Sequence, residues 1–455
     1  MKNLILNTDA YKLTHWQEYP SNLTKLYSYC EARVGGRFDE IVFFGLQMIL
    51  QDDLTTKITT EMIDEAEKMA AQTFGTKTYF NRQVWEKVRD LGYLPIEIKA
   101  LPEGLIVPAG TALFTIESTE DWFATTMNSL ETLLMHIWYP TTIATNDLYI
   151  KRALKPIYEK TGTLENLPFA VNDFGLRGVT SQEAGERAGA AHLLHFRGTD
   201  NMAANRAIEQ IYGANGRGMS VWATEHSVAT SYGEGSGELD YLTAQLDRAD
   251  DLTTISIVID SFDDLNFIEN VVGNPQMLER IKNRPGRIVF RPDSGHPIKT
   301  PLKILEALDK LFGHVKNDKG YKILQSNVGI IQGDGMKRET IVELYEKLTE
   351  KGWSADNLVV GSGGGLLQEG FDRDTLRFAI KASFAALSDG TEIAVQKKTK
   401  GKESKAGKLK VIFDEGYKTV SNLTEGEDLL QTVYKNGQIF PVKFDEIVAR
   451  VEKGL

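Results

Sequence analysis

The pattern that decides the fold is clearest in one stretch, Ile288-Val289-Phe290-Arg291-Pro292-Asp293-Ser294-Gly295. Apolar, β-prone residues typical of a buried strand are followed at once by charged and small residues, and a helix-like stretch comes next. The same succession occurs at five other places, where the polar ends centre on residues 173, 200, 260, 334 and 362. The second half of the chain therefore repeats one kind of structural unit without repeating a sequence.

The spacing of these strand ends indicates how the units are arranged. The steps along the chain are 27, 60, 33, 41 and 28 residues, and about 30 residues make one strand-and-helix unit. The step of 60 predicts an insertion or a strand that the pattern does not reveal. Six such strands with polar carboxyl ends predict an irregular (β/α) barrel with its active site on that face. An open, doubly wound parallel sheet is the alternative.

The rest of the 455-residue chain predicts a second, smaller α/β domain. Residues 96–100 alternate as a half-buried strand does, and residues 104–116 predict a strand pair interrupted by a turn. Asn128 and Glu131 form a capping-box pattern before an apolar run. The C-terminal strands are too few for a domain of their own. We therefore expect residues 1–165, joined by 385–455, to form one α/β domain and residues 166–384 to form the barrel.

Composition excludes several classes of protein. Hydrophobic residues make up 42% and charged residues 25%, which is ordinary globular usage and excludes a collagen, a coiled coil or a wholly disordered chain. A net charge of −11 disfavours non-specific nucleic-acid binding. The single cysteine, Cys30, allows no internal disulfide and suits a reducing compartment. No apolar run is long enough for a signal peptide or a membrane span, so we expect a cytoplasmic protein without a membrane partner.

A glycine-rich turn, residues 361–365, follows a valine-rich strand. Glycines let backbone N–H groups approach phosphate oxygens at a helix start, although such a turn also occurs without a ligand. No Walker lysine follows it. Several cations lie at or near strand ends, where either ion pairs or a polyphosphate would hold them: Arg177, Arg291, Arg373, Arg377 and Lys381. A lysine-rich segment, 397–410, is either a surface loop or a lid over an anion.

Acidic residues and one histidine complete the candidate chemistry. Carboxylates at neighbouring strand ends either hold ribose hydroxyls or Mg²⁺, or cap the helices that follow; they are Asp260, Asp263, Asp293 and Asp334. His226, beside Glu225, is either a surface residue or an acceptor of a phosphoryl group. No His and Cys spacing typical of zinc occurs.

Over almost its full length the chain resembles the nicotinamide phosphoribosyltransferase family of type II phosphoribosyltransferases. Ten short segments carry the resemblance, in family order: Thr8–His15, Tyr27–Arg33, Leu94–Ala100, Asp173–Gly178, Gly198–Asp200, Glu225–Ser227, Arg291–Gly295, Ile331–Gly335, Gly361–Gln368 and Asp428–Gly437. The resemblance implies an irregular α/β barrel with a smaller α/β domain, in a homodimer with two shared active sites. It implies the transfer of a phosphoribosyl group from 5-phosphoribosyl 1-diphosphate (PRPP) to nicotinamide, with Mg²⁺ and a facultative coupling to ATP.

The resemblance also implies roles for particular residues. The pyridine ring is expected between Phe174 and Tyr11 of a second subunit, with Asp200 and Arg291 at its amide. The ribose and 5′-phosphate are expected at Asp293, Gly333, Asp334, Gly363 and Gly364. The diphosphate is expected near Arg177, His226, Arg33, Arg373 and Lys381, and His226 also matches the phosphorylated histidine of the family. The residues expected to act in catalysis are His226, Asp200, Asp293 and Arg291; the Mg²⁺ ligands are not implied.

Asp200 favours nicotinamide as the substrate. A carboxylate accepts a hydrogen bond from an amide NH₂ group but repels the carboxylate of nicotinate, which is the alternative substrate. Three residues depart from the family pattern, namely Leu176, Trp222 and Ala379, and they bear on affinity and ATP coupling. The competing hypothesis is a catalytically silent dimer that binds phosphoribosyl compounds.

Overall fold

The computed structural model describes residues 3–399 and 404–455, and the chain divides by its internal contacts into two compact units. Unit 1 comprises Met1–Thr145, Ile208–Ala214 and Phe371–Leu455, and unit 2 comprises Asn146–Ala207 and Asn215–Gly370. The domain limits expected from the sequence, 165/166 and 384/385, stay a prediction.

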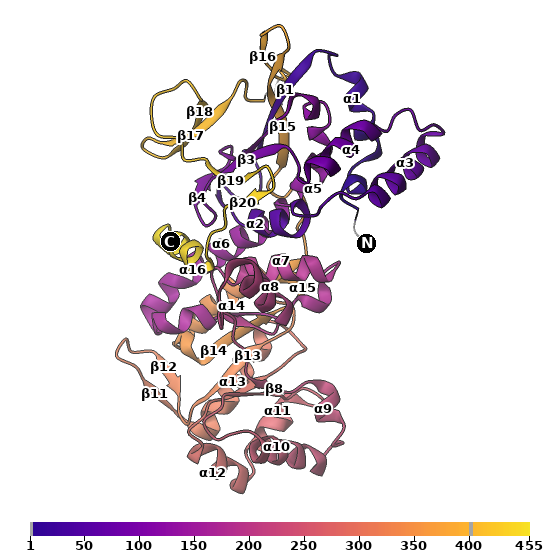
Figure 1. Cartoon of the computed structure of the whole chain (residues 1–455). Helices are drawn as coiled ribbons and strands as arrows, with labels where there is room; N and C mark the ends of the chain where they lie inside the picture. The colour runs from indigo at the N-terminus through magenta and orange to yellow at the C-terminus, as the bar shows by residue number, and fades with distance from the viewer. Residues whose placement is uncertain (1–2, 400–403) are drawn as a thin grey trace. The chain divides into compact units, whose positions relative to one another are not determined.

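Unit 2 is built on a seven-stranded sheet whose strand pairs are all parallel (Figure 1). Its strands, in spatial order, are β7 (Gly198–Thr199), β6 (Val171–Asp173), β14 (Leu358–Ser362), β13 (Val328–Gln332), β10 (Ile288–Arg291), β9 (Ile255–Val258) and β8 (Trp222–Ala223). β9 and β13 are buried at every position, as expected when both faces of a parallel sheet are covered.

Backbone hydrogen bonds link the two edges of this sheet. Met219, just before β8, forms a parallel bridge with Gly198 of β7. The Thr199 N–H donates to the Met219 carbonyl at 2.9 Å, and the Met219 N–H donates to the Arg197 carbonyl at 2.7 Å. The sheet therefore closes into an irregular barrel, which confirms the predicted fold class and excludes the open sheet.

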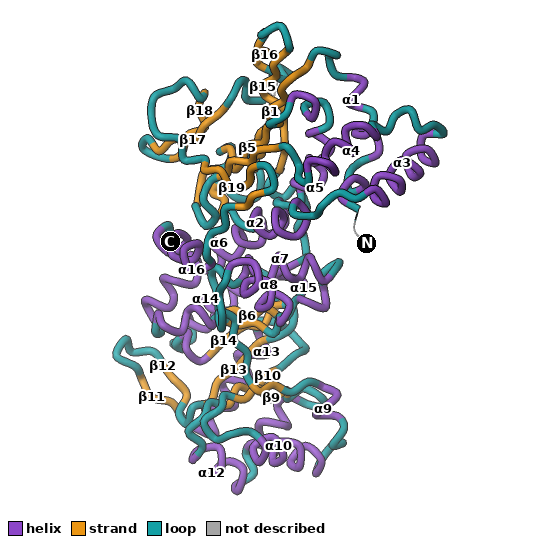
Figure 2. The backbone as a smooth tube through the Cα atoms, viewed as in Figure 1, coloured by secondary structure: helices purple, strands orange, loops and turns teal. Residues whose placement is uncertain are grey.

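β8 also explains the step of 60 residues between the strand ends at 200 and 260, because it is the strand that the sequence pattern did not reveal. It is a two-residue strand with both residues exposed in the isolated chain, so no apolar run reveals it. The helices of unit 2 connect the strands, and Figure 2 shows α10, α12 and α13 around β9 and β10. They are α7 (Gln182–His192), α9 (His226–Thr230), α10 (Ser236–Arg248), α11 (Asp264–Asn266), α12 (Pro275–Asn283), α13 (Lys299–Phe312), α14 (Arg338–Glu350) and α15 (Gly364–Leu367). A hairpin of β11 (His314–Lys316) and β12 (Lys322–Leu324) follows α13.

Unit 1 is built on a seven-stranded antiparallel sheet. Its order is β16 (Glu392–Ala394), β15 (Phe378–Leu387), β1 (Leu23–Ala32), β5 (Ala112–Ser118), β3 (Ile96–Ala100), β19 (Gln431–Lys435) and β20 (Gln438–Ile439). β3 alternates between buried and half-buried positions, as its sequence predicts. The C-terminal strands complete a sheet that begins near the N-terminus, so unit 1 is discontinuous in sequence.

Two small antiparallel pairs accompany this sheet: β2 (Glu40–Val42) with β4 (Ile106–Pro108), and β17 (Leu409–Phe413) with β18 (Tyr417–Ser421). Residues 104–116 therefore contain two strands, but β4 pairs with β2 whereas β5 joins the large sheet. Unit 1 also contains α1 (His15–Glu18), α2 (Leu46–Ile49), α3 (Thr60–Phe74), α4 (Arg82–Leu91), α5 (Glu131–Met135) and α16 (Phe444–Lys453). α6 (Trp138–Thr161) and α8 (Met202–Tyr212) have residues in both units.

The predicted capping box is wrong. Leu130 is the N-cap of α5 and makes no side-chain cap, while Asn128 lies in the 3₁₀ turn Met127–Leu130. The Asn128 amide instead donates to the Tyr19 hydroxyl at 2.9 Å. A long-range partner therefore takes the side chain that the local pattern assigned to a helix start. Over residues 3–399 and 404–455, no helix combines the length and apolarity needed to cross a membrane.

Candidate functional site

A cavity of about 320 Å³ follows the inside of the barrel in unit 2. Phe174 and Asp200 line it beyond the carboxyl ends of β6 and β7, and Ser220 lines it just before β8. Arg287 and Leu358 line it at the amino ends of β10 and β14. Carboxyl ends of barrel strands are where such folds hold their ligands. The structure therefore brings two of the three predicted nicotinamide-binding residues of this unit, Phe174 and Asp200, to one cavity, whereas Arg291 is not among the residues that line it.

Phe174 is held by the strand next to its own. Its N–H donates to the Ser362 carbonyl at 2.9 Å, which continues the pairing of β6 with β14. Its ring lies over Gly361, where an added Cβ would come within 2.0 Å of a ring carbon. The first glycine of the predicted phosphate turn therefore has a packing role, because only a residue without a side chain admits the Phe174 ring.

Asp200 follows β7 and is exposed in the isolated chain. Its N–H donates to the Asp173 carbonyl at 3.0 Å, and its Oδ1 accepts a hydrogen bond from the Ser220 hydroxyl at 2.5 Å. Ser220 was not among the predicted site residues, because it precedes the strand that the sequence pattern did not reveal. The hydroxyl fixes one carboxylate oxygen and leaves the other to accept from a ligand.

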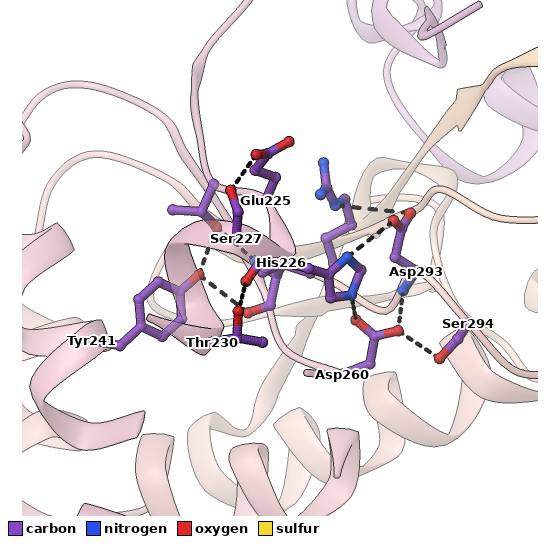
Figure 3. A network of polar contacts seen from close by, with 11 residues as sticks. Glu225, His226, Ser227, Thr230, Tyr241, Asp260, Asp293 and Ser294 are labelled. Carbon is purple, nitrogen blue, oxygen red and sulfur yellow. Dashed lines mark hydrogen bonds and ion pairs between the residues drawn. The ribbon is translucent and has the colours of Figure 1, made fainter. Parts of the chain in front are cut away.

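His226 begins α9 and lies between two carboxylates (Figure 3). Its Nε2 lies 3.0 Å from Asp260 Oδ1, and its Nδ1 lies 3.9 Å from Asp293 Oδ2. Asp260 Oδ2 in turn accepts the Asp293 N–H at 3.0 Å and the Ser294 hydroxyl at 2.5 Å. A carboxylate on one ring nitrogen fixes the tautomer and leaves the other nitrogen as a potential nucleophile.

Asp293 connects His226 to the other predicted ribose residues. Its carboxylate lies 4.0 Å from the Arg291 guanidinium, and its Oδ1 would be 2.4 Å from a Cβ placed on Gly333. Burial raises the pKa of Asp293, although the nearby charge of Arg291 opposes this. Asp334, which directly follows Gly333 after β13, is exposed. The ends of four neighbouring strands, β8, β9, β10 and β13, therefore converge on one polar cluster.

Asp263, the remaining carboxylate of the predicted set, caps a helix, whereas the glycine turn 361–365 lies at the start of α15. Asp263 caps α11 by accepting the Asn266 N–H at 2.7 Å, so the capping alternative is confirmed for this residue. Gly363 is the N-cap of α15, which has only four residues, and a Cβ on Gly364 would meet no atom within 4 Å. Arg177 is exposed in the loop after β6, one residue before Gly178, which lies against Gly364.

The other predicted residues belong to unit 1: Tyr11, Arg33, Arg373 and Lys381. Tyr11 is 58% exposed. Lys381 of β15 pairs in register with Tyr29 of β1, and Arg33 follows the same strand pair, where its Nε donates to the Arg377 carbonyl at 3.1 Å. Arg33, Arg373 and Lys381, here called the basic group of unit 1, therefore lie in or beside the strand pair of β1 and β15.

The lysine-rich segment 397–410 lies partly outside the described residues, which omit 400–403. Of its described lysines, Lys405 pairs with Glu31, and Lys408 pairs with Glu117 at 2.8 Å. The choice between a surface loop and a lid stays open. In the part of the chain that the structure describes, no three His, Cys, Asp or Glu side chains gather as metal ligands.

A closed parallel barrel with a polar cluster and an aromatic-lined cavity at its carboxyl end is the architecture of an α/β-barrel enzyme. The nicotinate phosphoribosyltransferase (NAPRTase) family model matches residues 169–438, and the model of the nicotinamide phosphoribosyltransferase N-terminal domain matches residues 3–98. Nicotinamide phosphoribosyltransferase of Xanthomonas campestris pv. campestris is 38% identical, with 96% of each chain covered. That of Acinetobacter baylyi is 31% identical over 98% of this chain and 96% of its own.

The fold agrees with these relationships. The crystal structure of human nicotinic acid phosphoribosyltransferase aligns with a TM-score of 0.61 at 18% identity, covering 98% of this chain and 93% of its own. At that identity the likeness concerns the fold alone. The sequence relationships are decisive: the chain belongs to the nicotinamide phosphoribosyltransferase family and is an enzyme of the phosphoribosyltransferase class.

Proposed function

We propose that this enzyme transfers the 5-phosphoribosyl group of PRPP to nicotinamide, giving nicotinamide mononucleotide and diphosphate. The observation that carries the proposal is the pairing of Phe174 and Asp200 in one cavity, with Asp200 Oδ1 held by Ser220. An aromatic face suits a flat pyridine ring that becomes cationic as the new bond forms. The free carboxylate oxygen suits an amide N–H donor.

The ribose and phosphate groups would bind at the neighbouring strand ends. Asp293, against Gly333, offers a carboxylate for ribose hydroxyls, and Gly364 leaves open space beside backbone N–H groups for the 5′-phosphate. Breaking the bond to diphosphate builds positive charge on the ribose and negative charge on the leaving group. Arg177 and the basic group of unit 1 would stabilise the leaving charge, and positioning would supply much of the remaining rate enhancement.

The proposal includes a homodimer with shared active sites. Tyr11 and the basic residues Arg33, Arg373 and Lys381 would come to each site from a second copy of the chain. Tyr11 supports this role because it is a large aromatic side chain that is 58% exposed in the isolated chain. A second aromatic face would enclose the pyridine ring between two planes.

The residues present fit Mg²⁺ bound together with substrate. This ion commonly uses one or two carboxylates plus substrate phosphates, and Asp260 and Asp293 are the adjacent carboxylates of the cluster. When bound there, the ion would neutralise charge on the diphosphate. The absence of a three-ligand protein cage among the described residues is compatible with this mode.

The facultative coupling to ATP would run through His226. With Nε2 held by Asp260, the Nδ1 lone pair can attack the γ-phosphorus of ATP, and ADP leaves as the N–P bond forms. Asp260 stabilises the charge that develops on the ring. The phosphorylated ring would then lie beside Asp293, at the proposed ribose site.

A product assay tests the proposal. The purified protein is incubated with Mg²⁺ and PRPP and with either nicotinamide or nicotinate, and each mononucleotide is quantified. Product mainly from nicotinamide supports the proposal. Product mainly from nicotinate would retain the reaction class but overturn the role of Asp200. A folded dimer that forms neither product and releases no diphosphate would favour the silent binder.

A further inference from the structure

A fully buried histidine lies behind the pyridine-binding residues and is not used in the mechanism above. His192 ends α7 and has no exposed surface. Its Nδ1 lies 2.7 Å from Asp147 Oδ2, and its Nε2 lies 3.1 Å from the Gly198 carbonyl oxygen. Both ring nitrogens therefore face hydrogen-bond acceptors.

This geometry fixes the charge of the ring. A neutral imidazole carries one N–H and one lone pair, so one of the two acceptors would meet a lone pair, which is costly in a buried site. With an ionised carboxylate at Asp147, both contacts are hydrogen bonds only when both nitrogens carry protons. Burial alone lowers the pKa of His192, but the hydrogen bond and charge of Asp147, together with the charge of Asp173, raise it overall. The Phe196 ring also stacks on His192, with centroids 5.4 Å apart.

The histidine is connected to both pyridine-binding strands. Gly198, whose carbonyl it contacts, lies on β7 two residues before Asp200 and pairs with Asn172 of β6. On β6 the Asp173 carboxylate is fully buried, and its pKa is raised by burial, with the charge of His192 the strongest opposing influence.

The buried Asp173 carboxylate holds the neighbours of both site residues. Its Oδ1 accepts the Gly175 N–H at 2.7 Å, next to Phe174. Its Oδ2 accepts the Asn201 side-chain amide at 3.1 Å, next to Asp200. A charged His192 therefore supports this arrangement twice, through the Gly198 carbonyl and through the charge of Asp173.

We propose that His192 is a permanently charged imidazolium that acts as a positioning residue for the pyridine pocket, holding β6 and β7 so that Phe174 and Asp200 face one cavity. The role of the pocket rests on the proposed function. The charge state does not, because it follows from the contacts of His192 alone.

Removing the charge leaves two buried carboxylates, Asp147 and Asp173, without a counter-charge, which is strongly unfavourable. We expect His192→Gln to raise the KM for nicotinamide at least tenfold. The KM for PRPP stays within about twofold, because most of the proposed PRPP residues of unit 2 follow β10, β13 and β14. Adding Asp147→Asn removes one of the two carboxylates, so the double variant recovers part of the loss.

The charge state is tested on the wild-type protein by NMR with ¹⁵N-labelled histidine, in which His192→Gln assigns the signal among the seven histidines. We expect two ring N–H signals for His192 at neutral and at mildly alkaline pH; one N–H signal and one bare nitrogen overturn the proposal. If the single variant does not fold, the double variant, which also lacks His192, assigns the signal, and its kinetics test the positioning role.

Kinetics test the positioning role. The control is His314→Gln in the β11 hairpin, which removes another histidine paired with a carboxylate, 2.7 Å from Asp309, and leaves both KM values unchanged. Equal rises in both KM values, or a fall in kcat alone, contradict positioning of the pyridine pocket. If the wild-type enzyme forms no product from nicotinamide, the proposed function fails, while the NMR result still decides the charge of His192.

Discussion

Replacement of Asp200 by asparagine is the most informative perturbation, because it removes one charge and keeps the shape of the side chain. Two like unit charges about 4 Å apart repel by about 1 kcal/mol in bulk water and by about 4 kcal/mol at an effective dielectric constant of about 20. Asp200 is exposed in the isolated chain, and bound substrate would exclude water from around its carboxylate. The two values are therefore the lower and upper limits of the repulsion between Asp200 and the carboxylate of nicotinate. Removal of this repulsion corresponds to about a five- to thousandfold change in the preference for nicotinamide over nicotinate.

The assay measures kcat/KM for nicotinamide and for nicotinate with the wild-type enzyme and with Asp200→Asn. We expect the ratio to move toward nicotinate by at least about fivefold, and Asp200→Ser should move it in the same direction. The control is Asp318→Asn, an exposed carboxylate in the β11–β12 turn, which should leave the ratio unchanged. A ratio that stays the same in both Asp200 variants would refute the assignment of Asp200 to the amide.

Three further predictions follow from described contacts. Gly361→Ala places a methyl group within 2.0 Å of the Phe174 ring, a clash of about 1–3 kcal/mol, so the KM for nicotinamide should rise at least about fivefold in steady-state assays. His226→Gln removes the proposed phosphoryl acceptor, so added ATP should no longer stimulate product formation. Burial raises the pKa of Glu103 from 4.5 to about 6, and its Oε2 accepts from the Tyr212 hydroxyl. The folded state thus holds this proton more tightly than the unfolded chain. Ionisation therefore lowers the free energy of unfolding as the pH rises through this range, by about 2 kcal/mol, and Glu103→Gln should escape this loss in urea titrations at about pH 4 and about pH 7.

Each of these predictions has an outcome that would contradict it. Gly364→Ala adds the same methyl group where no atom lies within 4 Å, in the space proposed for the 5′-phosphate, so it should raise the KM for PRPP rather than the KM for nicotinamide. An equal rise in the KM for nicotinamide would point to the glycine turn in general. Undiminished stimulation by ATP in His226→Gln would remove His226 from the coupling. A stability difference between Glu103→Gln and wild type that does not vary with pH would show that Glu103 keeps its ordinary pKa.

The sequence predicts the barrel because its parallel strands are short apolar runs, each ending in a polar group, and this pattern needs no knowledge of the partner strand. It misses β8 because Trp222 and Ala223 are only two residues, exposed in the isolated chain, and recognisable only from their pairing with β9. Ser220 is missed for the same reason. The capping box fails because Tyr19, a distant residue, competes successfully for Asn128.

Residue types and strand ends predict the candidate site only in part. Asp293 and Gly333 follow different strands, and their close approach agrees with the rule that carboxyl ends of parallel strands meet at one edge. The pairing of His226 with Asp260 could not be predicted, because the two are 34 residues apart and nothing local to either specifies the contact. The charge of His192 is likewise invisible in sequence, because it depends on two acceptors contributed by other elements.

The discontinuous sheet of unit 1 has a consequence for the synthesis of the protein. β1 pairs with β15, so Tyr27 meets Phe384, and β3 pairs with β19 near the C-terminus. During translation one edge of β1 stays without its partner until almost the whole chain has left the ribosome, and unpaired edges invite association with other chains. The strands of the barrel, by contrast, all lie between residues 171 and 362 and are available earlier. A ribosome that stops between residues 362 and 378 would therefore release a chain with every barrel strand present and the first sheet unfinished, which makes premature termination in this interval a specific hazard for aggregation of this enzyme.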